Sequence, residues 1–238
     1  MYHAAPLISL KGVALAYVQR KGLMKKTLFW PLKEVSFDVY PGETLGIIGV
    51  NGAGKSSLLR LLAGIVSPDR GEVVVKKGSN ISLLALQLGF IPYLTGRENA
   101  VLSGILFGLN RASIEEKLND IIAFADLGDF IDQPVVSYSS GMKARLGFSV
   151  AFHAEPDIML IDEVLGVGDE AFRKKSTHAM HQRIYSDKTV VIVSHNMLLL
   201  RKICHRVIWI HDGYVHALGK TPDVINAYLD AVGAESSA

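Results

Sequence analysis

The sequence predicts an α/β fold with a parallel sheet covered on both faces, and three observations lead to this. Two short segments, Ile158–Ile161 and Thr189–Val193, are almost wholly apolar, which is typical of strands buried on both sides. Strand segments alternate with helical segments along most of the chain, so right-handed crossovers are expected. The 238 residues are 49% hydrophobic and 20% charged, which suits one large folded domain and excludes disorder as the main state.

Charge and cysteine content narrow the class of protein. Twenty-five basic and 23 acidic residues leave a formal net charge of +2, which gives no argument for a nucleic-acid partner. The single cysteine, Cys204, cannot form a disulfide within the chain, so a reducing cytosolic compartment is the default expectation. No apolar run approaches the ~20 residues of a membrane-spanning helix. No secretory signal is visible at the N-terminus.

The first forty residues predict a pair of antiparallel strands. Leu7–Tyr17 and Leu32–Tyr40 are rich in β-formers and partly alternate. Between them, Arg20–Lys26 predicts a basic loop, and the apolar residues Leu28–Trp30 follow it. Two interpretations of this segment stay open. It is either a solvated hairpin loop with one buried edge, or a surface for anionic lipid headgroups or a membrane partner.

From Thr44 onward single strands and helices alternate. Leu45–Ile48 predicts an apolar strand, followed by a glycine-rich turn and a helix from about Lys55 to Ala63. Besides the two strands named first, further strands are predicted at Val73–Val75, Ile81–Leu86, Val207–Ile210 and Tyr214–Ala217. Further helices are predicted within Gly96–Ala125, with a break near Gly108–Asn110, and at 141–154, 169–185, 196–204 and 222–232.

The glycine-rich segment Gly49–Ser56, here called the phosphate loop, fits the pattern G-x-x-x-x-G-K-[ST] in full. Its glycines let the backbone wrap so that N–H groups face phosphate oxygens, and the next helix directs its positive dipole end at the same anions. Lys55 can reach the β- and γ-phosphates, and Ser56 can offer its hydroxyl to Mg²⁺. A structural glycine turn is the alternative. The expected nucleotide-binding residues are Asn51, Gly52, Ala53, Gly54, Lys55, Ser56 and Ser57.

Two carboxylates, Asp162 and Glu163, end the apolar strand that begins at Ile158. In an open α/β sheet the carboxyl ends of the strands present ligands. We therefore expect Asp162 to hold Mg²⁺ through water, and Glu163 to polarise the attacking water as a general base. A helix cap is the structural alternative for the pair.

A serine-rich segment, Tyr138–Met142, lies shortly before the acidic strand and opens a helix. With the phosphate loop before it and the acidic strand and Ser194-His195 after it, this segment resembles the signature loop of ATP-binding-cassette (ABC) ATPases. The resemblance covers nearly the whole chain. It implies a P-loop NTPase with a RecA-like parallel core, an antiparallel β subdomain and a helical subdomain near residues 90–150. It implies one nucleotide-binding domain over residues 1–238. Some members of the family carry an extra C-terminal carbohydrate-binding domain, and we expect none in this chain.

The signature loop departs from the family's usual L-S-G-G-Q, because Tyr138, Ser140 and Met142 stand where Leu, the first Gly and Gln are usual. Ser139 still supplies a hydroxyl, and the helix N-terminus still supplies its dipole. A helix cap without a ligand is the alternative. Together with the segments Leu94–Asn99, Lys143–Leu146 and Asp162–Asp169, these changes look like the branch that exports O-antigen, capsular polysaccharide or teichoic acid.

The resemblance also implies roles for single residues across a dimer. In ABC proteins the signature loop faces the nucleotide bound by the other subunit, so Ser139, Ser140 and Gly141 would contact the ATP held by Lys55 of a second copy. His195 is implied to be the switch histidine, which contacts the γ-phosphate and orients water.

Three further roles follow from the same resemblance. Gln87 is implied to sense Mg²⁺, although its distance to Pro92 is about one residue off the family pattern. Tyr17 is the candidate to stack on adenine, with a core tyrosine as the rival interpretation. Asp169 is implied to be the loop aspartate at the dimer seam. His178 and His181 have no third ligand nearby in sequence and predict no metal site.

The implied function is the ATPase subunit of an exporter for a lipid-linked polysaccharide. Two copies would clamp two Mg-ATP and act on a separate transmembrane permease, expected in two copies, through the surface between about Leu88 and Asn110. The polymer would be cargo of the permease, and the chain would lie peripherally on the cytoplasmic face of the bacterial inner membrane. An ABC ATPase for another cargo is the alternative. Translation types fit less well because one phosphate loop is present, and repair types because only about eighty residues, without sustained heptads, separate it from the signature loop. A kinase with the same loop would leave Tyr138–Met142 and Ser194-His195 without a role.

Overall fold

The computed structural model describes residues 4–21, 25–84, 89–162, 168–184 and 188–235. The chain forms two compact units. The first unit comprises Met1–Leu83, Ile158–Glu163 and Ile184–Ala238, and the second comprises Leu84–Asp157 and Val164–Arg183.

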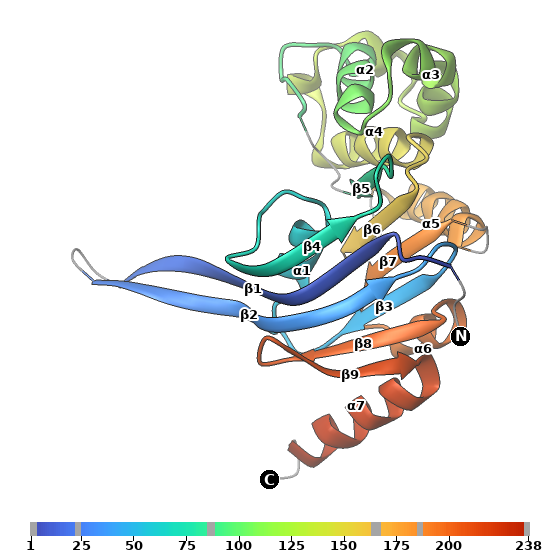
Figure 1. Cartoon of the computed structure of the whole chain (residues 1–238). Coiled ribbons are helices and arrows are strands. Elements are labelled where there is room, and N and C mark those ends of the chain that lie inside the picture. Colours follow the sequence, from blue (N-terminus) through green and yellow to red (C-terminus); the bar gives the residue numbers. More distant parts are fainter. Residues whose placement is uncertain (1–3, 22–24, 85–88, 163–167, 185–187, 236–238) are drawn as a thin grey trace. The chain divides into compact units, whose positions relative to one another are not determined.

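The first unit is built on a nine-stranded sheet (Figure 1). Its order is β4-β1-β2-β9-β8-β3-β7-β6-β5, so neighbours in space are often distant in sequence. The strands are β1 (Ile8–Lys21), β2 (Lys25–Val39), β3 (Thr44–Ile48), β4 (Arg70–Val75), β5 (Ile81–Leu83), β6 (Ile158–Asp162), β7 (Thr189–Val193), β8 (Arg206–His211) and β9 (Tyr214–Lys220).

The parallel part of the sheet confirms the predicted α/β core. Strand β3 pairs in parallel with β7 and β8, and β7, β6 and β5 continue the parallel ladder. Every residue of β3 and β7 is buried, as expected for strands that are apolar on both faces. On β6 only Asp162, the last residue, is partly exposed. Asp162 therefore sits where the sheet edge opens toward a ligand.

The antiparallel part of the sheet confirms the predicted strand pair but corrects its length. Strand β1 pairs with β2 and with β4, both antiparallel. The predicted basic loop Arg20–Lys26 is largely strand, because the ladder continues through the Cα partners Arg20–Lys26 and Lys21–Lys25. Clustered charge suggested a loop, but the backbone of Arg20, Lys21, Lys25 and Lys26 is paired in register.

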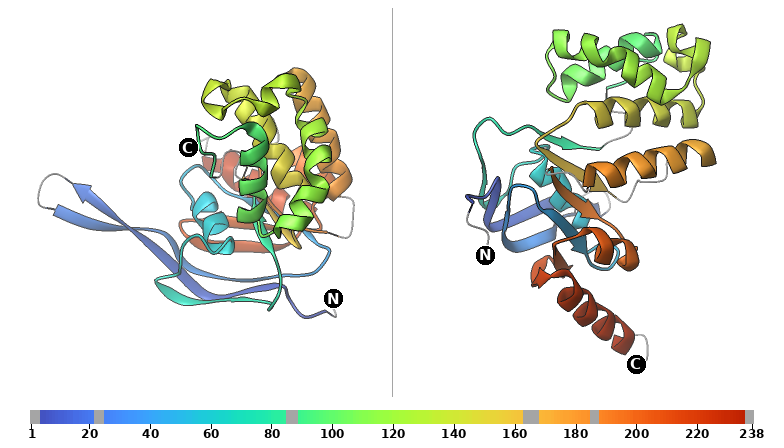
Figure 2. Two further views of the ribbon diagram at one scale, coloured as in Figure 1. Left: turned by 90° about the horizontal axis from the view of Figure 1, so that it is seen from above. Right: turned by 90° about the vertical axis from the view of Figure 1, so that its right-hand side faces the viewer.

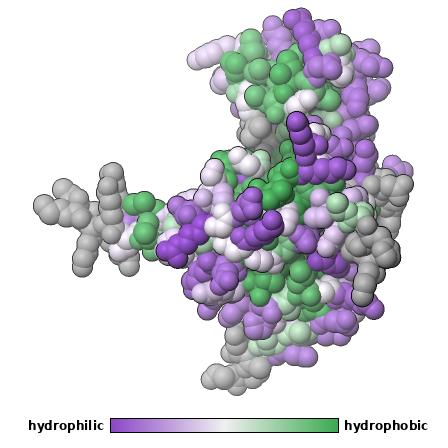
Figure 3. Space-filling model, in the orientation of Figure 1, coloured by the Kyte–Doolittle hydropathy of each residue, from purple (hydrophilic) through white to green (hydrophobic). Residues whose placement is uncertain are grey.

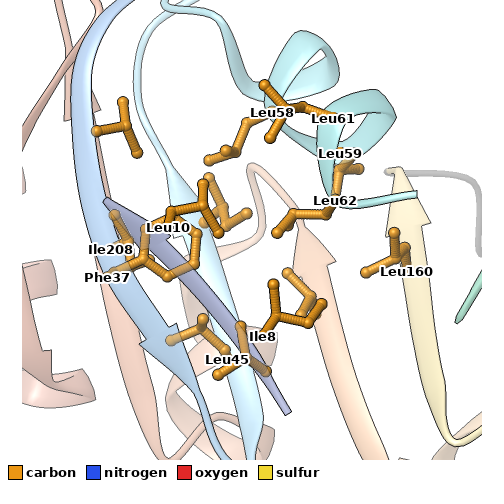
Figure 4. Packing of buried hydrophobic residues seen from close by; sticks show 14 of the residues in the cluster. Ile8, Leu10, Phe37, Leu45, Leu58, Leu59, Leu61, Leu62, Leu160 and Ile208 are labelled. Carbon is orange, nitrogen blue, oxygen red and sulfur yellow. The ribbon is translucent and has the colours of Figure 1, made fainter. Parts of the chain in front are cut away.

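The core of the first unit is aliphatic and joins its helix α1 (Lys55–Leu62) to the sheet. Leu58, Leu59, Leu61 and Leu62 of α1 are almost completely buried among side chains from β1, β2, β3, β6 and β8 (Figure 4). The phosphate loop thus leads into a helix that the sheet holds firmly in place. Two later helices, α6 (Met197–Ile203) and α7 (Thr221–Glu235), complete the helices that are described in this unit.

The second unit is helical (Figure 2). Its elements are α2 (Gly96–Leu106), α3 (Arg111–Ala125), the 3₁₀ turns η1 (Gly128–Asp132) and η2 (Val135–Ser137), α4 (Ser140–His153) and nearly all of α5 (Glu170–Ile184). Helices α2, α3 and α4 pack on one another. The predicted break near Gly108–Asn110 is confirmed, since Asn110 caps α3 by accepting a hydrogen bond from Ser113 N.

Aromatic side chains from three helices pack together in the interior of this unit. Phe148 of α4 is fully buried and packs with Phe124 of α3, Phe152 of α4 and Phe172 of α5, in stacked and edge-on arrangements.

In the part of the chain that the structure describes, no helix combines the length and the apolar character that crossing a bilayer requires.

Candidate nucleotide-binding site

The phosphate loop has a backbone that only glycine can supply at several positions. Gly49, Gly52 and Gly54 have φ values of 152°, 83° and 101°. A Cβ on Gly49 would lie 2.3 Å from the carbonyl oxygen of Ile210, and one on Gly54 would lie 2.3 Å from that of Pro31. A Cβ on Gly52 would meet nothing within 4 Å. The loop is therefore wedged against β8 and β2 on one side and open on the other.

Lys55 lies inside this loop. Its side chain is buried, and its Nζ donates to the carbonyl oxygens of Gly49 at 2.7 Å and Val50 at 2.9 Å. The ammonium group is thus held inside a glycine-rich turn, and a cation in such a turn attracts anions.

A cavity of about 280 Å³ opens at the loop and joins the phosphate loop to two strand ends. From the loop and α1 it is lined by Asn51, Gly52, Gly54, Lys55, Ser56 and Ser57. Asp162 reaches it from the carboxyl end of β6, and His195 reaches it just after β7. The structure therefore brings eight of the sequence-predicted site residues together within the first unit.

The donor set of this cavity fits a nucleotide phosphate tail with a divalent cation. Backbone N–H groups, the Lys55 ammonium and the N-terminal end of α1 suit phosphate oxygens. The Ser56 hydroxyl and the Asp162 carboxylate are oxygen ligands of the kind that Mg²⁺ prefers beside phosphates. Ala53 differs from its neighbours, because its side chain is buried and it lines a second hollow of about 530 Å³ instead.

Phe29 and Pro31 of β2 also line the cavity, and sequence reasoning did not assign them to it. Phe29 is 43% exposed and is shared with the second hollow, which also holds Trp30. The predicted adenine residue, Tyr17, is the Cα partner of Phe29 and packs against the apolar core. Its hydroxyl is buried with no hydrogen-bond partner among the described residues. Phe29 belongs to β2 because this strand begins at Lys25 and not at the predicted Leu32, and no sequence signal pointed to its place in the cavity wall.

The signature loop lies in the second unit, at the start of α4. Ser139 is the N-cap of the helix and its hydroxyl accepts a hydrogen bond from Met142 N at 3.2 Å. Ser140 and Gly141 follow in the first turn. A Cβ on Gly141 would meet only the Ser139 hydroxyl within 4 Å, at 3.8 Å. The first turn of the helix is open to an approaching ligand on this side.

Tyr138 explains the first departure from the usual signature sequence. It is buried, and its hydroxyl donates to the carbonyl oxygen of Phe130 at 2.5 Å. Burial raises the pKa of the Tyr138 phenol. A Cβ on Gly96 would lie 2.1 Å from this hydroxyl, so the larger side chain at 138 requires glycine at the start of α2.

Asp169 lies just before α5 and is engaged within the second unit. Its carboxylate accepts a hydrogen bond from Phe172 N at 2.8 Å, in the manner of an N-cap, and lies 3.1 Å from the Arg145 guanidinium. These two contacts, the backbone hydrogen bond first, lower the pKa of Asp169. Arg145 also forms an ion pair with Asp126 at 3.1 Å. Two other predicted site residues, Gln87 and Glu163, lie outside the described residues.

Comparison with known sequences places these features in a family. The sequence profile described as ABC transporter matches residues 32–166, more than half of the chain. The teichoic acids export ATP-binding protein TagH of Listeria innocua is 42% identical over 208 residues, which cover 87% of this chain and 62% of that protein. The O-antigen export system ATP-binding protein RfbB of Klebsiella pneumoniae is 45% identical over 210 residues, which cover 88% of this chain and 85% of that protein.

Solved structures agree with this result. A dimeric ATP-binding cassette in a post-hydrolysis state, bound to ADP and Pi, matches with a TM-score of 0.72 and 25% identity, covering 90% of this chain and 98% of its own. An ATP-binding subunit of an ABC transporter matches in fold with a TM-score of 0.74 and 23% identity, covering 98% of this chain and 100% of its own. The chain spans less than two thirds of the length of the TagH relatives that it matches. On the profile and the RfbB match, the chain belongs to the ABC transporter family.

Proposed function

We propose that this chain is the ATP-hydrolysing subunit of an exporter that moves a lipid-linked polysaccharide across the bacterial inner membrane. The observation that carries the ATP-dependent part is the cavity in which Lys55, Asp162 and His195 meet. The names of relatives that export teichoic acids or O-antigen support the choice of cargo. An ABC transporter for another cargo is the second candidate, since the same cavity would serve it.

Each residue of the cavity has a role in this proposal. The loop amides and Lys55 bind and orient the phosphates, while Ser56 and Asp162 would hold Mg²⁺, joined by Gln87. When bound, Mg²⁺ neutralises charge on the β- and γ-phosphates. Glu163, which follows Asp162, takes a proton from the attacking water, and His195 orients that water.

A second copy of the chain completes each site in this proposal. The exposed first turn of α4, with Ser139, Ser140 and Gly141, offers a hydroxyl and a helix dipole to an anion. A dimeric cassette among the structural neighbours supports this arrangement. Asp169 would lie near the seam, fixed in place by Arg145. Closure by ATP binding then follows from the higher affinity of the closed dimer for the nucleotide.

The second unit offers a surface for a transmembrane permease between about Leu88 and Asn110. Apolar side chains are exposed there, with Ile91 at 43%, Tyr93 at 83%, Ile105 at 44% and Leu106 at 53%. The buried Asn99 fixes the segment before α2, since its amide nitrogen lies 2.9–3.0 Å from three carbonyl oxygens and its Oδ1 accepts from Ile91 N at 2.7 Å. A fixed apolar platform of this kind suits docking to another chain. It would hold the protein peripherally at the cytoplasmic face of the inner membrane.

The proposal is tested by purifying the chain together with its permease and reconstituting both in vesicles. We expect ATP hydrolysis that rises when a lipid-linked polysaccharide is supplied, together with movement of that polymer across the bilayer. Absence of hydrolysis by the assembled complex would remove the enzymatic part. Stimulation by a different cargo alone would remove the polysaccharide part and favour the second candidate.

A further inference from the structure

The lead-in segment, residues 133–137, runs directly into the signature loop and is paired with the segment that precedes α2. Val136 N donates to the carbonyl oxygen of Pro92 at 2.8 Å. Val135 N donates to the carbonyl oxygen of Leu94 at 2.9 Å. These backbone hydrogen bonds hold the two segments side by side within the second unit.

The segment before α2 is in turn held by a buried side chain. The carbonyl oxygen of Leu94 accepts a second hydrogen bond, from Asn99 Nδ2 at 3.0 Å, so both of its lone pairs are used. The same amide nitrogen contacts the carbonyl oxygens of Ile91 and Thr95, and Asn99 is fully buried. Because a satisfied, buried hydrogen-bond network is rigid, the lead-in segment is paired with a firm support.

Tyr138, the residue after the lead-in segment, adds a side-chain contact to this support. Its side chain is 5% exposed, and its hydroxyl donates to the carbonyl oxygen of Phe130 at 2.5 Å. A Cβ on Gly96 would lie 2.1 Å from that hydroxyl and 3.0 Å from the carbonyl oxygen of Ile131. The hydroxyl therefore fills the space between the start of α2 and η1. A leucine at this position would supply no hydrogen bond there.

Ser139 follows Tyr138 and is fixed from both sides. On the side of α4, its hydroxyl accepts a hydrogen bond from Met142 N at 3.2 Å, and its carbonyl oxygen accepts one from Lys143 N at 3.1 Å. On the other side, it is joined to a tyrosine whose side chain cannot turn without breaking a buried hydrogen bond. The direction of the Ser139 hydroxyl thus depends on the contact that Tyr138 makes.

The outer side of these segments is apolar. Ile91, Phe130 and Val136 are 43%, 44% and 60% exposed. Figure 3 shows hydrophobic residues at the surface of the second unit. Tyr138 is buried by contrast, so a substitution that removes its hydroxyl changes the interior of the unit and leaves this outer surface as it is.

We propose that Tyr138 is a positioning residue of the shared nucleotide site, because its buried hydroxyl fixes the start of α4 to the start of α2. Held in this way, Ser139 presents its hydroxyl in a constant direction to the nucleotide of a second copy. The inference rests on the proposed function, in which Ser139 acts on that nucleotide. It deepens that function by giving the tyrosine at position 138 a role in the site.

The test compares ATP-driven dimerisation of E163Q, which lacks the proposed general base, with that of E163Q/Y138F. Light scattering after size exclusion, over a series of protein concentrations, gives the concentration at which half of the chains are dimeric. We expect Y138F to raise this concentration about 10-fold or more, because each dimer contains two Ser139 contacts. The ATP affinity of the dilute, monomeric chain should stay unchanged, since the phosphate loop belongs to the other unit.

The matched control is Y40F, which removes a tyrosine hydroxyl that lies 3.3 Å from an Asp38 carboxylate oxygen in the first unit. It should leave dimerisation unchanged, and circular dichroism and thermal unfolding verify that each variant is folded. Equal dimerisation of E163Q and E163Q/Y138F would overturn the inference, and so would an equal loss in the control. If E163Q itself stayed monomeric with ATP, the shared site of the proposed function would fall first.

A second variant decides the matter even if Y138F does not fold. G96A places a methyl group 2.1 Å from the Tyr138 hydroxyl and therefore displaces this hydroxyl without removing it. We expect G96A to weaken ATP-driven dimerisation of E163Q, and its additional effect to be smaller when Y138F is also present, because residues in contact are not additive. Dimerisation of E163Q/G96A at the strength of E163Q would contradict the positioning role.

Discussion

The ammonium group of Lys55 is hydrogen-bonded to two carbonyl oxygens of the loop that it serves. The same side chain therefore stabilises the shape of the loop and supplies its positive charge. Gly49 and Gly54 add a steric condition, because a Cβ at either position would lie 2.3 Å from a backbone oxygen of a neighbouring strand. At this scale the shape of the loop depends on glycine at two positions and on the two contacts of Lys55.

Lys55→Ala should weaken nucleotide binding about 30-fold or more, because truncating one partner of a buried, charge-assisted contact costs on the order of 2 kcal/mol or above. Nucleotide affinity can be measured by titration calorimetry, with thermal unfolding as a check on the fold. Lys76→Ala, at an exposed position, is the matched control and should bind as the wild type does. Unchanged affinity in Lys55→Ala would contradict the assignment of the phosphate loop.

At the scale of the element, α2 and the segment before it depend on one buried side chain. Asn99 is fully buried, and its amide contacts the carbonyl oxygens of Ile91, Leu94 and Thr95. Thr95 and Glu98 form a capping box at the same helix end. The exposed apolar platform around Tyr93 is therefore supported from within.

Asn99→Ala should lower the free energy of unfolding by about 3 kcal/mol, since several buried backbone groups lose their hydrogen-bond partner. Denaturant unfolding measures this change directly. Asn119→Ala, an exposed position on α3, should change stability by no more than about 0.5 kcal/mol. Equal effects of the two substitutions would mean that the Asn99 contacts contribute little. A second expected consequence of Asn99→Ala is weaker association with the permease.

At the scale of the whole molecule, the proposed function requires two copies, because the phosphate loop and the signature loop would act on one nucleotide from different chains. The two loops lie in different units of the chain, each with its own packed interior. Replacing the general base proposed at Glu163 should block hydrolysis and so keep the dimer in its ATP-bound form.

Glu163→Gln should keep ATP binding and slow hydrolysis by on the order of 10²-fold or more, as the loss of a general base does. With hydrolysis blocked, ATP and Mg²⁺ should produce a dimer that light scattering after size exclusion detects. Adding Ser139→Arg, which places a bulky side chain in the first turn of α4, should return the protein to a monomer. A Glu163→Gln variant with normal turnover would exclude Glu163 from the mechanism, and a monomer with saturating ATP would contradict the shared site.

The sequence predicted most elements, for identifiable physical reasons. Strands that are apolar on both faces predict a parallel sheet covered on both sides. Because the carboxyl ends of parallel strands lie at one edge of the sheet, Asp162 and His195 could be expected near the phosphate loop. Asn110 caps a helix in a way that local sequence reveals. The contacts of Tyr138 with Phe130 and Gly96 could not be predicted in this way, since they depend on tertiary packing.

The length of the hairpin was the main error, and it concealed Phe29. Consecutive bases suggested a loop, whereas pairing in register keeps Arg20 and Lys26 in strands. Because the strands continue, Phe29 is carried to the wall of the cavity. The roles of Gln87 and Glu163 remain predictions from the resemblance, because both lie outside the described residues.

Strand β2 has a consequence for the nucleotide cavity. It begins at Lys25, and six residues later it reaches Pro31, whose carbonyl oxygen faces Gly54 of the phosphate loop. A displacement of β2 would therefore shift the wall of the nucleotide cavity, because Phe29 and Pro31 both line it. A partner that held β2 still would in the same way fix the backbone against which Gly54 of the phosphate loop packs.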